Sequence, residues 1–574
     1  MAQPVNALIL PRARTRRLSL DLAPALLAAA VVAYLVLVPL GFLLWRTFFE
    51  DGRPTLAHLR AAYAVGGLTT TLVSTLEFAA GTTLLALALG TALAWVLVRT
   101  DVPGRRLLTV GVLVPLVLPG VLHTFAWIFL AAPRTGLVNE AFHGLFGVRP
   151  LHVFGLGGMI GVEGLHLAPL AFLLVAAGLR SIDPTLEEAA LAAGARPLAV
   201  MRRITLALVR PALAAAALIV LVRALEAFEV PTLLGTPGGV QVFTTRVWDA
   251  VSVSPATAVA RAGAYALPLI GLTILGTALL ALVSRGRGTY EAIGGRGFPQ
   301  RRAELGRLRF VAAGAVSIYV LVAAVLPLAA LLWISLQPYY AAPSRAALSR
   351  VTLAGYRQAL SAESLDAIKT SVLLAAGSAT VVVAITALAA WLVVRTRLPG
   401  RRLVDQLALV PLALPGLVFG VALLAFYGRP ALPVYGTIWI LLIAYVTRFL
   451  PFGMRSTSVS FLQVGRELEE SARTSGASFT RTFTRVLLPL AAPGLAAGWL
   501  AVAVFSVREL SSSLLLVPPG RTVLAVELWD SFRSGELAKT AALGVLTTVG
   551  LALLTWIAYR LGAVLRHRGM RAAR

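Results

Sequence analysis

Five charged side chains that could contact an ion or a ligand lie in two otherwise apolar stretches, VRALEAFEVPTLLGTPGG from Val222 and VRELSSSLLLVPPG from Val507. Carboxylates that face a polar path would suit a hard cation, because oxygen ligands match such a cation best. The alternative is internal pairing between arginine and glutamate that only fixes helix packing. Arg223 is one of the five, and the four that we take as candidates to line a path are Glu226, Glu229, Arg508 and Glu509.

The other reactive residue types do not have the spacing of a catalytic or metal site. Glu163 and His166 have the E-x-x-H spacing of di-iron bundles, but that motif occurs in pairs and only one copy is present. We therefore expect a structural or gating role and assign no metal ligand. The remaining histidines, His123, His143 and His152, show no ligand spacing, and no histidine lies near the serines at 511–513 to activate a nucleophile.

Composition indicates that membrane helices position these residues. Hydrophobic residues make up 58% of the 574 residues and the mean hydropathy is +0.84, more than a soluble core needs. Several runs reach the ~20 apolar residues that span a bilayer. The absence of cysteine excludes disulfides and thiolate metal sites. We expect an all-α integral membrane protein with twelve transmembrane helices, at 23–45, 70–98, 107–132, 156–180, 206–230, 260–284, 310–336, 370–394, 405–428, 434–456, 486–514 and 538–562.

The formal net charge of +26 describes topology and not a nucleic-acid partner. Arginines cluster in alternate loops, for example at 99–106, 196–203 and 285–309. Positive charge in short loops stays on the cytoplasmic side of the membrane. We therefore expect both termini in the cytoplasm and no contact with nucleic acid.

The sequence repeats itself. RTDVPGRRLLTVGVLVPLVLPGVL from Arg99 matches RTRLPGRRLVDQLALVPLALPGLV from Arg395 at an offset of 296 residues, and later matches continue at an offset of 282. Six spans in each copy make this a parallel repeat, in which both halves enter the membrane in the same sense. The expected organisation is an N-terminal arm at 1–22, a first half at 23–284, a cytoplasmic linker at 285–309, a second half at 310–562 and a tail at 563–574.

Each half carries the same charged, glycine-broken loop between its fourth and fifth spans, at 181–205 and at 463–487. The first reads EEAALAAGARPLAVMRRITL from Glu187 and the second EESARTSGASFTRTFTRVLLP from Glu469. Asp183 and Pro184 form a good helix start, and Gly194 should end that helix before a second short one begins. A polar connector is the simplest alternative. A rigid helix–glycine–helix present once in each half, however, suits docking to a two-fold partner.

The chain here resembles the transmembrane subunits of binding-protein-dependent ABC importers, whose signature is EAA, three residues, glycine, nine residues and I-x-L-P. The resemblance covers nearly the whole chain, and it departs from the signature at Ala207, at Ser471 and at Gly465-Arg466 in place of the Asp-Pro start. It implies the type I importer permease fold and a coupling helix in each loop. The residues it assigns to ATPase coupling are Glu187, Glu188, Ala189, Ala190 and Gly194 in the first loop, and Glu469, Glu470, Ala472 and Gly476 in the second.

The resemblance also implies partners. The only lysines are Lys369 and Lys539, and neither follows a glycine, so the chain has no phosphate-binding loop of its own. ATP hydrolysis is expected in two separate cytoplasmic ABC ATPase subunits, with substrate delivered by a periplasmic binding protein. The chain itself is expected to be no enzyme, to bind no cofactor and to lie in the bacterial inner membrane. The two halves would rock about a central site in alternating access.

The stretches around Glu226 and Glu509 resemble those of the ferric-iron branch of this family, so ferric iron is the expected substrate. Thiamine, polyamines and phosphonates are alternatives within the same permease role. A secondary transporter driven by an ion gradient is an alternative of another class, although it has no need for two surface helices of equal design. A membrane-bound enzyme would need a converging set of acid, base or metal ligands, and the sequence contains none.

Overall fold

The computed structural model describes residues 15–64, 66–182, 184–253, 258–285 and 303–572. In this part of the chain, ten helices are long and apolar enough to cross a membrane, or twelve if each of two bent helix pairs counts as one span. This agrees with the predicted all-α membrane protein. The only strands among the described residues are the two short antiparallel ones, β1 (Phe49–Glu50) and β2 (Arg53–Pro54).

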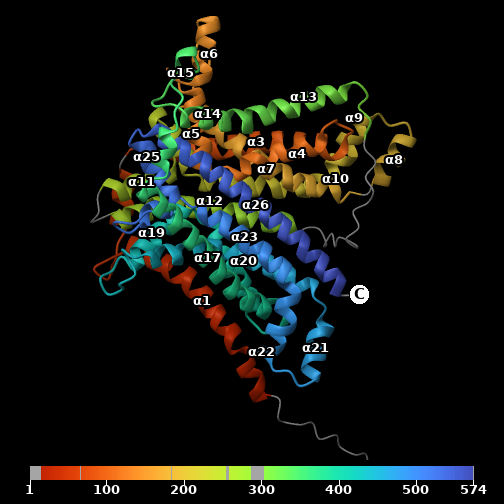
Figure 1. Ribbon diagram of the computed structural model, residues 1–574. Coiled ribbons are helices and arrows are strands. Elements are labelled where there is room, and N and C mark those ends of the chain that lie inside the picture. The colour runs from red at the N-terminus through yellow and green to blue at the C-terminus, as the bar shows by residue number, and fades with distance from the viewer. Residues whose placement is uncertain (1–14, 65, 183, 254–257, 286–302, 573–574) are drawn as a thin grey trace, which may run out of the picture.

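The long helices run between two ends of the molecule (Figure 1). Those of the first half are α1 (Thr15–Phe48), α3 (Leu68–Arg99), α4 (Arg105–Val117), α5 (Gly120–Ala131), α7 (Leu156–Arg180), α10 (Leu206–Glu226) and α12 (Ala258–Arg285). Those of the second half are α13 (Leu308–Val320) with η5 (Leu321–Val325) and α14 (Leu326–Ser335), α17 (Ala362–Arg395), α18 (Arg401–Leu409) with η6 (Val410–Ala413), α19 (Gly416–Tyr427), α20 (Ile438–Gln463), α23 (Leu488–Val507) and α26 (Leu537–Ala572).

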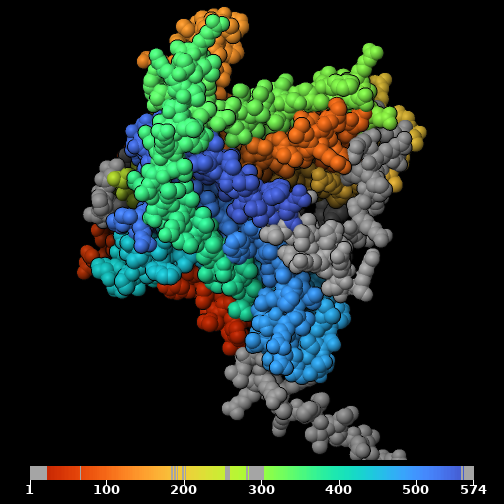
Figure 2. Space-filling model, in the orientation of Figure 1, coloured from red at the N-terminus to blue at the C-terminus, as the bar shows by residue number. Residues whose placement is uncertain are grey.

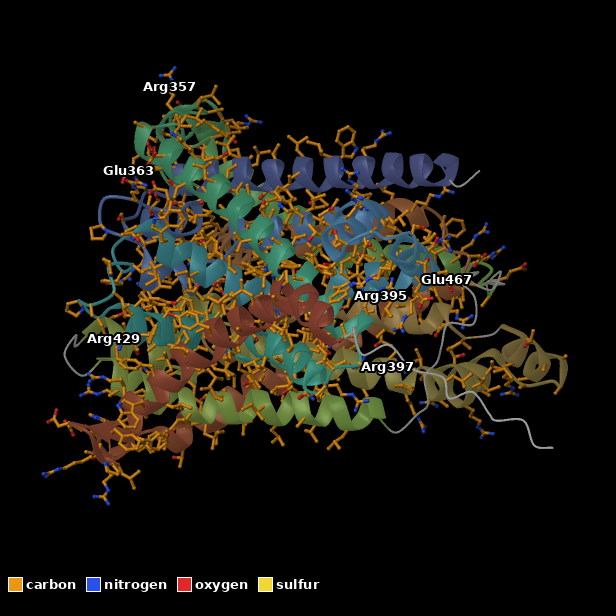
Figure 3. The ribbon with its side chains drawn as sticks, turned by 90° about the horizontal axis from the view of Figure 1, so that it is seen from below. Arg357, Glu363, Arg395, Arg397, Arg429 and Glu467 are labelled. Atoms are coloured by element: carbon orange, nitrogen blue, oxygen red, sulfur yellow. The ribbon has the colours of Figure 1, made fainter. Side chains whose placement is uncertain are left out.

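Short helices gather at the two ends. Figure 1 shows α6 (Leu137–Phe146), α11 (Phe243–Val253), α15 (Arg345–Leu348) and α25 (Leu524–Arg533) at one end. The connections of the two halves also contain α2 (Ala57–Ala64), η3 (Pro231–Gly235), η4 (Thr236–Gly238), α16 (Ala354–Ala359) and α24 (Ser513–Leu516). The other end carries α8 (Pro184–Ala192), α9 (Pro197–Val200), η2 (Met201–Thr205), α21 (Arg466–Thr474), α22 (Phe479–Thr482) and η7 (Phe483–Leu487). Figure 3 separates the same two ends by labelled side chains: Arg357, Glu363 and Arg429 lie at the first, and Arg395, Arg397 and Glu467 at the second.

The two halves exchange their first helices. Helix α1 packs against α17 and α19 of the second half, and α13 and α14 pack against α4 and α5 of the first half. In Figure 2, α13 lies against the segment that contains α4, near the upper edge of the face shown. The two sets of contacts are equivalent, because α4 and α5 correspond to α18 and α19 in the repeat, and α1 packs against α18 as well as α19. The first helix of each half therefore joins the halves together.

Close helix packing inside each half depends on glycine. A β-carbon on Gly90 of α3 would lie 2.7 Å from the backbone nitrogen of Phe172 on α7, and one on Gly453 of α20 would lie 2.4 Å from Val382 on α17. Small residues let membrane helices approach in this way, where packing and not the hydrophobic effect holds the helices together. The pairs α3–α7 and α17–α20 form the matching centres of the two halves.

Two predicted spans, 107–132 and 405–428, are not single straight helices. The chain bends by 101° between α4 and α5 and by 108° between η6 and α19. Proline explains both bends, because it has no N–H to donate and holds the preceding residue in an extended conformation. Leu118 and Leu414 precede Pro119 and Pro415 and have ψ angles of 124° and 126°. These prolines align in the two copies of the repeat, but no bend was predicted from them.

The ends of other predicted segments also differ. The spans predicted at 206–230 and 486–514 end as helices at Glu226 and Val507, where the charged stretches leave helical geometry. Helix α1 begins at Thr15, before the predicted start at 23, and α26 continues to Ala572, past the predicted end at 562. Most of the predicted N-terminal arm and linker, residues 1–14 and 286–302, lies outside the described residues.

Candidate functional site

The two repeated loops fold alike at the same end of the molecule (Figure 1). In each, a nine-residue helix, α8 or α21, ends before a glycine, and a four-residue helix, α9 or α22, follows. Gly194 and Gly476 both have φ of +84°, a left-handed conformation that glycine adopts without steric cost. A β-carbon at either glycine would meet no atom within 4 Å, so backbone conformation and not space requires glycine here.

The second loop is tied to the helices beneath it by Glu469. One carboxylate oxygen lies 2.8 Å from Nε of Arg395, and the indole nitrogen of Trp391 donates to the other at 3.4 Å. Arg395 also donates to the carbonyl oxygens of Phe461 and Val464, at 2.7 and 2.6 Å. The side chains of Arg395 and Glu469 are only 6% and 12% exposed. Glu469 therefore anchors α21 to the ends of α17 and α20.

The other predicted coupling residues of this loop lie at the surface. Glu470 and Gly476 are exposed and Ala472 is half-buried. In the first loop Ala189 and Gly194 are exposed and Ala190 is half-buried. The side chains of Glu187 and Glu188, and Asp183 with its predicted helix cap, lie outside the described part of the structure. Each loop thus presents a short helix and a glycine turn at the surface.

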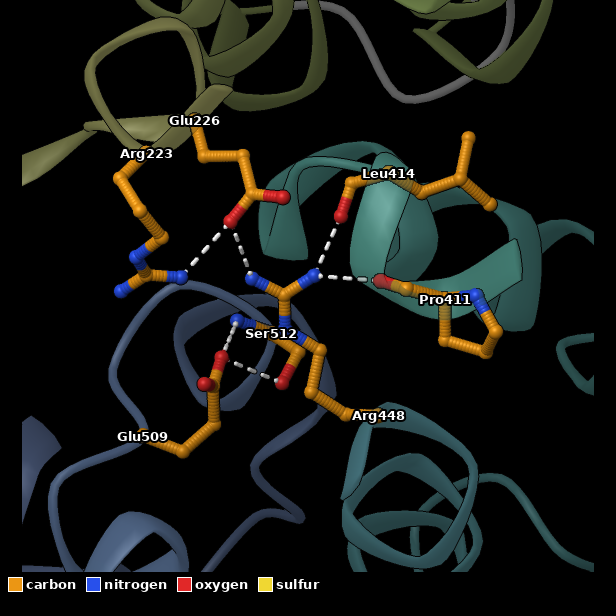
Figure 4. Close-up of polar contacts among 7 residues, drawn as sticks. All are labelled: Arg223, Glu226, Pro411, Leu414, Arg448, Glu509 and Ser512. Atoms are coloured by element: carbon orange, nitrogen blue, oxygen red, sulfur yellow. Dashed lines mark hydrogen bonds and ion pairs between the residues drawn. The ribbon is translucent and has the colours of Figure 1, made fainter. Parts of the chain in front are cut away.

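A charged cluster joins the halves in the interior of the molecule (Figure 4). Oε2 of Glu226, at the end of α10, accepts hydrogen bonds from Arg223 at 2.8 Å and from Arg448 of α20 at 3.0 Å. The Glu226 side chain is 3% exposed and that of Arg448 is 11% exposed, whereas that of Arg223 is 45% exposed. The arginine–glutamate pairing considered from the sequence is present, and one of its partners comes from the opposite half.

Arginines also cap the carbonyl groups that the two helix bends leave without donors. Arg448 donates to the carbonyl oxygen of Pro411 at 3.0 Å and to that of Leu414. Arg508, which follows α23, donates to Leu116 at 2.6 Å and Leu118 at 3.1 Å in the first bend. Helix ends lack intrahelical partners for their last carbonyls, so these guanidinium groups supply the missing donors.

Arg448 was missed in the sequence analysis, although its position carried a signal. At the offset of 282 residues it matches His166, and Pro169 matches Pro451 three residues later. A lone arginine within a predicted span requires a partner. Both residues lie beside the first glycine after a bend: a β-carbon on Gly120 would lie 3.8 Å from His166, and one on Gly416 would lie 3.7 Å from the Arg448 guanidinium carbon.

Of the remaining path candidates, Glu509 is committed to its own turn. Its Oε1 accepts from the backbone nitrogen of Ser512 at 3.0 Å and from the hydroxyl at 2.9 Å. Ser513 donates to the Glu509 carbonyl and shares a hydrogen bond of 2.8 Å with Tyr445. Glu229 is half-buried in the segment after α10. Two of the three serines at 511–513, Ser512 and Ser513, thus have structural hydrogen bonds.

The histidines of the sequence analysis lie in two places. The rings of His123 and His166 are 5.1 Å apart, next to the first bend, and Glu163 is 8% exposed one turn before His166. His143 belongs to α6, and Nδ1 of His152 lies 2.9 Å from the carbonyl oxygen of Phe154. Among the described residues, no three histidine, aspartate or glutamate side chains converge to hold a metal ion.

Aromatic rings of the two halves meet at Phe228. The ring of Phe228 lies 5.5 Å from that of Trp248 and 5.7 Å from that of Trp529, which belongs to the second half. Asp249 accepts a hydrogen bond from Gln241 at 3.2 Å, and burial raises the pKa of its carboxyl group. An aromatic stack therefore joins the halves beside the charged cluster, where ring pairs contribute ~0.5–1.5 kcal/mol beyond their buried area.

Comparison with known proteins places this architecture in a family. Residues 85–289 and 381–568 each match the family described as binding-protein-dependent transport system inner membrane component. An ABC transporter permease of Sinorhizobium fredii is 28% identical over 74% of this chain and 74% of its own length. The ferric transport system permease FbpB of Actinobacillus pleuropneumoniae is 24% identical over 75% of this chain and 62% of its own. A relative in Salmonella typhimurium, named for 2-aminoethylphosphonate transport, is 31% identical over 27% of this chain and 59% of its own.

The chain belongs to the family of binding-protein-dependent inner membrane components, which are the permease subunits of ABC importers. It carries two such permease domains in one polypeptide, one in each half. It is thus a multi-pass bacterial inner-membrane transport subunit and not an enzyme.

Proposed function

We propose that this permease imports ferric iron, which it receives from a periplasmic binding protein and releases to the cytoplasm. Two cytoplasmic ATPase subunits drive the process, each seated on one helix–glycine–helix loop. Binding of one ATPase subunit at each loop is supported by the matching geometry of the two loops. Both lie at one end of the molecule, and Gly194 and Gly476 have the same φ of +84°. Equal surface elements on pseudo-symmetric halves suit a partner that is itself two-fold symmetric.

Iron as the substrate is supported by relatives named for ferric transport, which align with three quarters of the chain. The geometry favours a division of labour, because Glu226 and Glu509 already accept hydrogen bonds from the protein itself. Because at least one oxygen of each carboxylate is engaged in this arrangement of the halves, the two glutamates do not form a complete cage for a cation. Substrate selection then belongs to the binding protein, and the membrane domains supply the path.

Alternating access follows from the arrangement of the halves. The loops are anchored to the transmembrane helices, as Glu469 is to Arg395, so a closing ATPase pair would move helices together with loops. Exchange of α1 and α13 between the halves would keep them associated as they rock. Both loops, and with them the two termini, face the cytoplasm in this proposal.

Transport assays in proteoliposomes test the substrate. The permease would be reconstituted with its ATPase and with its binding protein, and uptake of radiolabelled ferric iron would be compared with that of 2-aminoethylphosphonate, a polyamine and thiamine. We expect ATP-dependent uptake of ferric iron alone. Uptake of 2-aminoethylphosphonate in place of iron would favour the phosphonate role, which the 31%-identical relative suggests. Uptake driven by an ion gradient without ATP would support a secondary transporter.

A further inference from the structure

Arg448 contacts both halves of the molecule at the charged cluster (Figure 4). It belongs to α20 of the second half, and its Nη2 lies 3.0 Å from Oε2 of Glu226 in the first half. Its Nη1 donates to the carbonyl oxygens of Pro411 and Leu414 in the second bend. One guanidinium group thus connects the end of α10 with the bend before α19.

The contact between Arg448 and Glu226 is buried, so it cannot open without replacement partners. The two side chains are 11% and 3% exposed, and a buried charge that loses its partner is strongly unfavourable. Separation of the halves must therefore expose both groups to water or to substrate. The second carboxylate oxygen of Glu226, Oε1, is buried and has no hydrogen-bond partner among the described residues. That oxygen is available to a different partner in another arrangement of the halves.

The repeat shows that the arrangement is asymmetric. The equivalent of Arg448 in the first half is His166, whose ring lacks the guanidinium fork that bonds carbonyl groups through Nη1 and a carboxylate through Nη2. The first bend is capped by Arg508, again from the second half. Arginines of the second half thus hold both bends, and Arg448 in addition forms an ion pair with a carboxylate of the first half.

We propose that Arg448 is a positioning residue for transport, and that its ion pair with Glu226 forms in one access state and breaks in the other. The inference rests on the alternating access proposed above. While the pair is closed, the second bend and the end of α10 move as one unit. When the halves rock apart, the pair opens and the Glu226 carboxylate turns to the path. A variant that lacks the pair should therefore still hydrolyse ATP but import less substrate for each ATP hydrolysed.

Variants of the pair test this role in the reconstituted complex. We expect Arg448→Gln to lower substrate uptake per ATP hydrolysed by about tenfold, which corresponds to about 1.4 kcal/mol. Arg448→Lys keeps the charge but not the guanidinium fork, so its uptake per ATP hydrolysed should lie between those of Arg448→Gln and the wild type. The matched control is Arg455→Gln on the same helix, whose ion pair with Asp405 at 3.8 Å stays within the second half. It should transport like the wild type.

A distance measurement keeps the proposal testable if Arg448→Gln does not fold. The chain has no cysteine, so Ala227→Cys, beside Glu226, combined with Ala444→Cys, one turn before Arg448 on α20, introduces the only thiols of the chain and keeps the ion pair. A short bifunctional thiol reagent should join them severalfold less in one of two states, nucleotide-free or trapped with ATP and vanadate. Equal yields in both states, or normal coupling in Arg448→Gln, would overturn the proposal. Wild-type complex that takes up no substrate with ATP would instead refute the proposed function.

Discussion

Nε of Arg395 lies 2.8 Å from a carboxylate oxygen of Glu469, and this ion pair fastens the second repeated loop to the end of α17. The next residue, Glu470, is exposed. Two adjacent glutamates of one short helix thus have different surroundings. The first holds the loop on the membrane domain, and the second faces the place where we propose that an ATPase subunit docks.

Alanine variants of these two glutamates should separate stability from coupling. We expect Glu469→Ala to lower the free energy of unfolding by about 2–3 kcal/mol, because it leaves the Arg395 guanidinium without its buried partner. Glu470→Ala should leave stability unchanged and weaken stimulation of the ATPase. Thermal unfolding of the detergent-solubilised protein and ATPase assays of the complex measure the two effects. Equal loss of stability in both variants would contradict the division of roles.

The glycine turns of the two repeated loops should tolerate asparagine better than alanine. Gly476 has φ of +84°, and an alanine in that region costs ~1–2 kcal/mol even where space is free. We expect Gly476→Ala, and likewise Gly194→Ala, to reduce uptake per ATP hydrolysed without loss of membrane insertion. Gly476→Asn should recover part of the loss, since asparagine visits this conformation. If both alanine variants couple normally, the docking role of the loops is wrong.

Two repeat-related glycines should differ in their response to alanine. A β-carbon on Gly416 would lie 3.1 Å from Oε1 of Glu509 and 3.2 Å from Ser511, whereas one on Gly120 would meet only His166 at 3.8 Å. Overpacking of this kind costs ~1–3 kcal/mol. We therefore expect Gly416→Ala to lower the melting temperature and Gly120→Ala to leave it unchanged. The same shift for both would show that the second bend is no tighter than the first.

Thiol labelling should locate the coupling loops in the cytoplasm. Ser475 in the second loop and Ser349 after α15 are both exposed and lie at opposite ends of the molecule. In this cysteine-free chain, Ser475→Cys should react with a membrane-impermeant maleimide only after the cells are opened, and Ser349→Cys should react in intact spheroplasts. Labelling of Ser475→Cys from outside would reverse the proposed orientation.

Much of this architecture could be predicted from the sequence because its determinants are local. Apolar runs of sufficient length predict spans, and a glycine after a short polar helix predicts a left-handed turn, as found at Gly194 and Gly476. The bends at 115–119 and 411–415 were missed because the runs stay apolar across them. Two prolines four residues apart, followed by glycine, were the available signal.

The charged cluster could be predicted only in part. The sequence identified Glu226 and Arg508 as residues that need partners. Arg223 is a nearby partner of Glu226, but the other partners lie far away in the chain, at Arg448 and at the carbonyl groups of the first bend. The inward position of Glu469 likewise depends on how α17 packs beneath the loop. Hydropathy and motif spacing carry no information on such contacts, which arise when the halves come together.

The most direct test of the account is ATP-dependent uptake in proteoliposomes that contain this chain with and without its ATPase subunits. The binding protein, loaded with ferric iron, would be present on the outside in both preparations. We predict that iron accumulates only when the ATPase is bound and ATP is supplied on the cytoplasmic side. Accumulation of iron at the same rate without the ATPase would contradict the central claim that the two loops transmit movement from a separate motor.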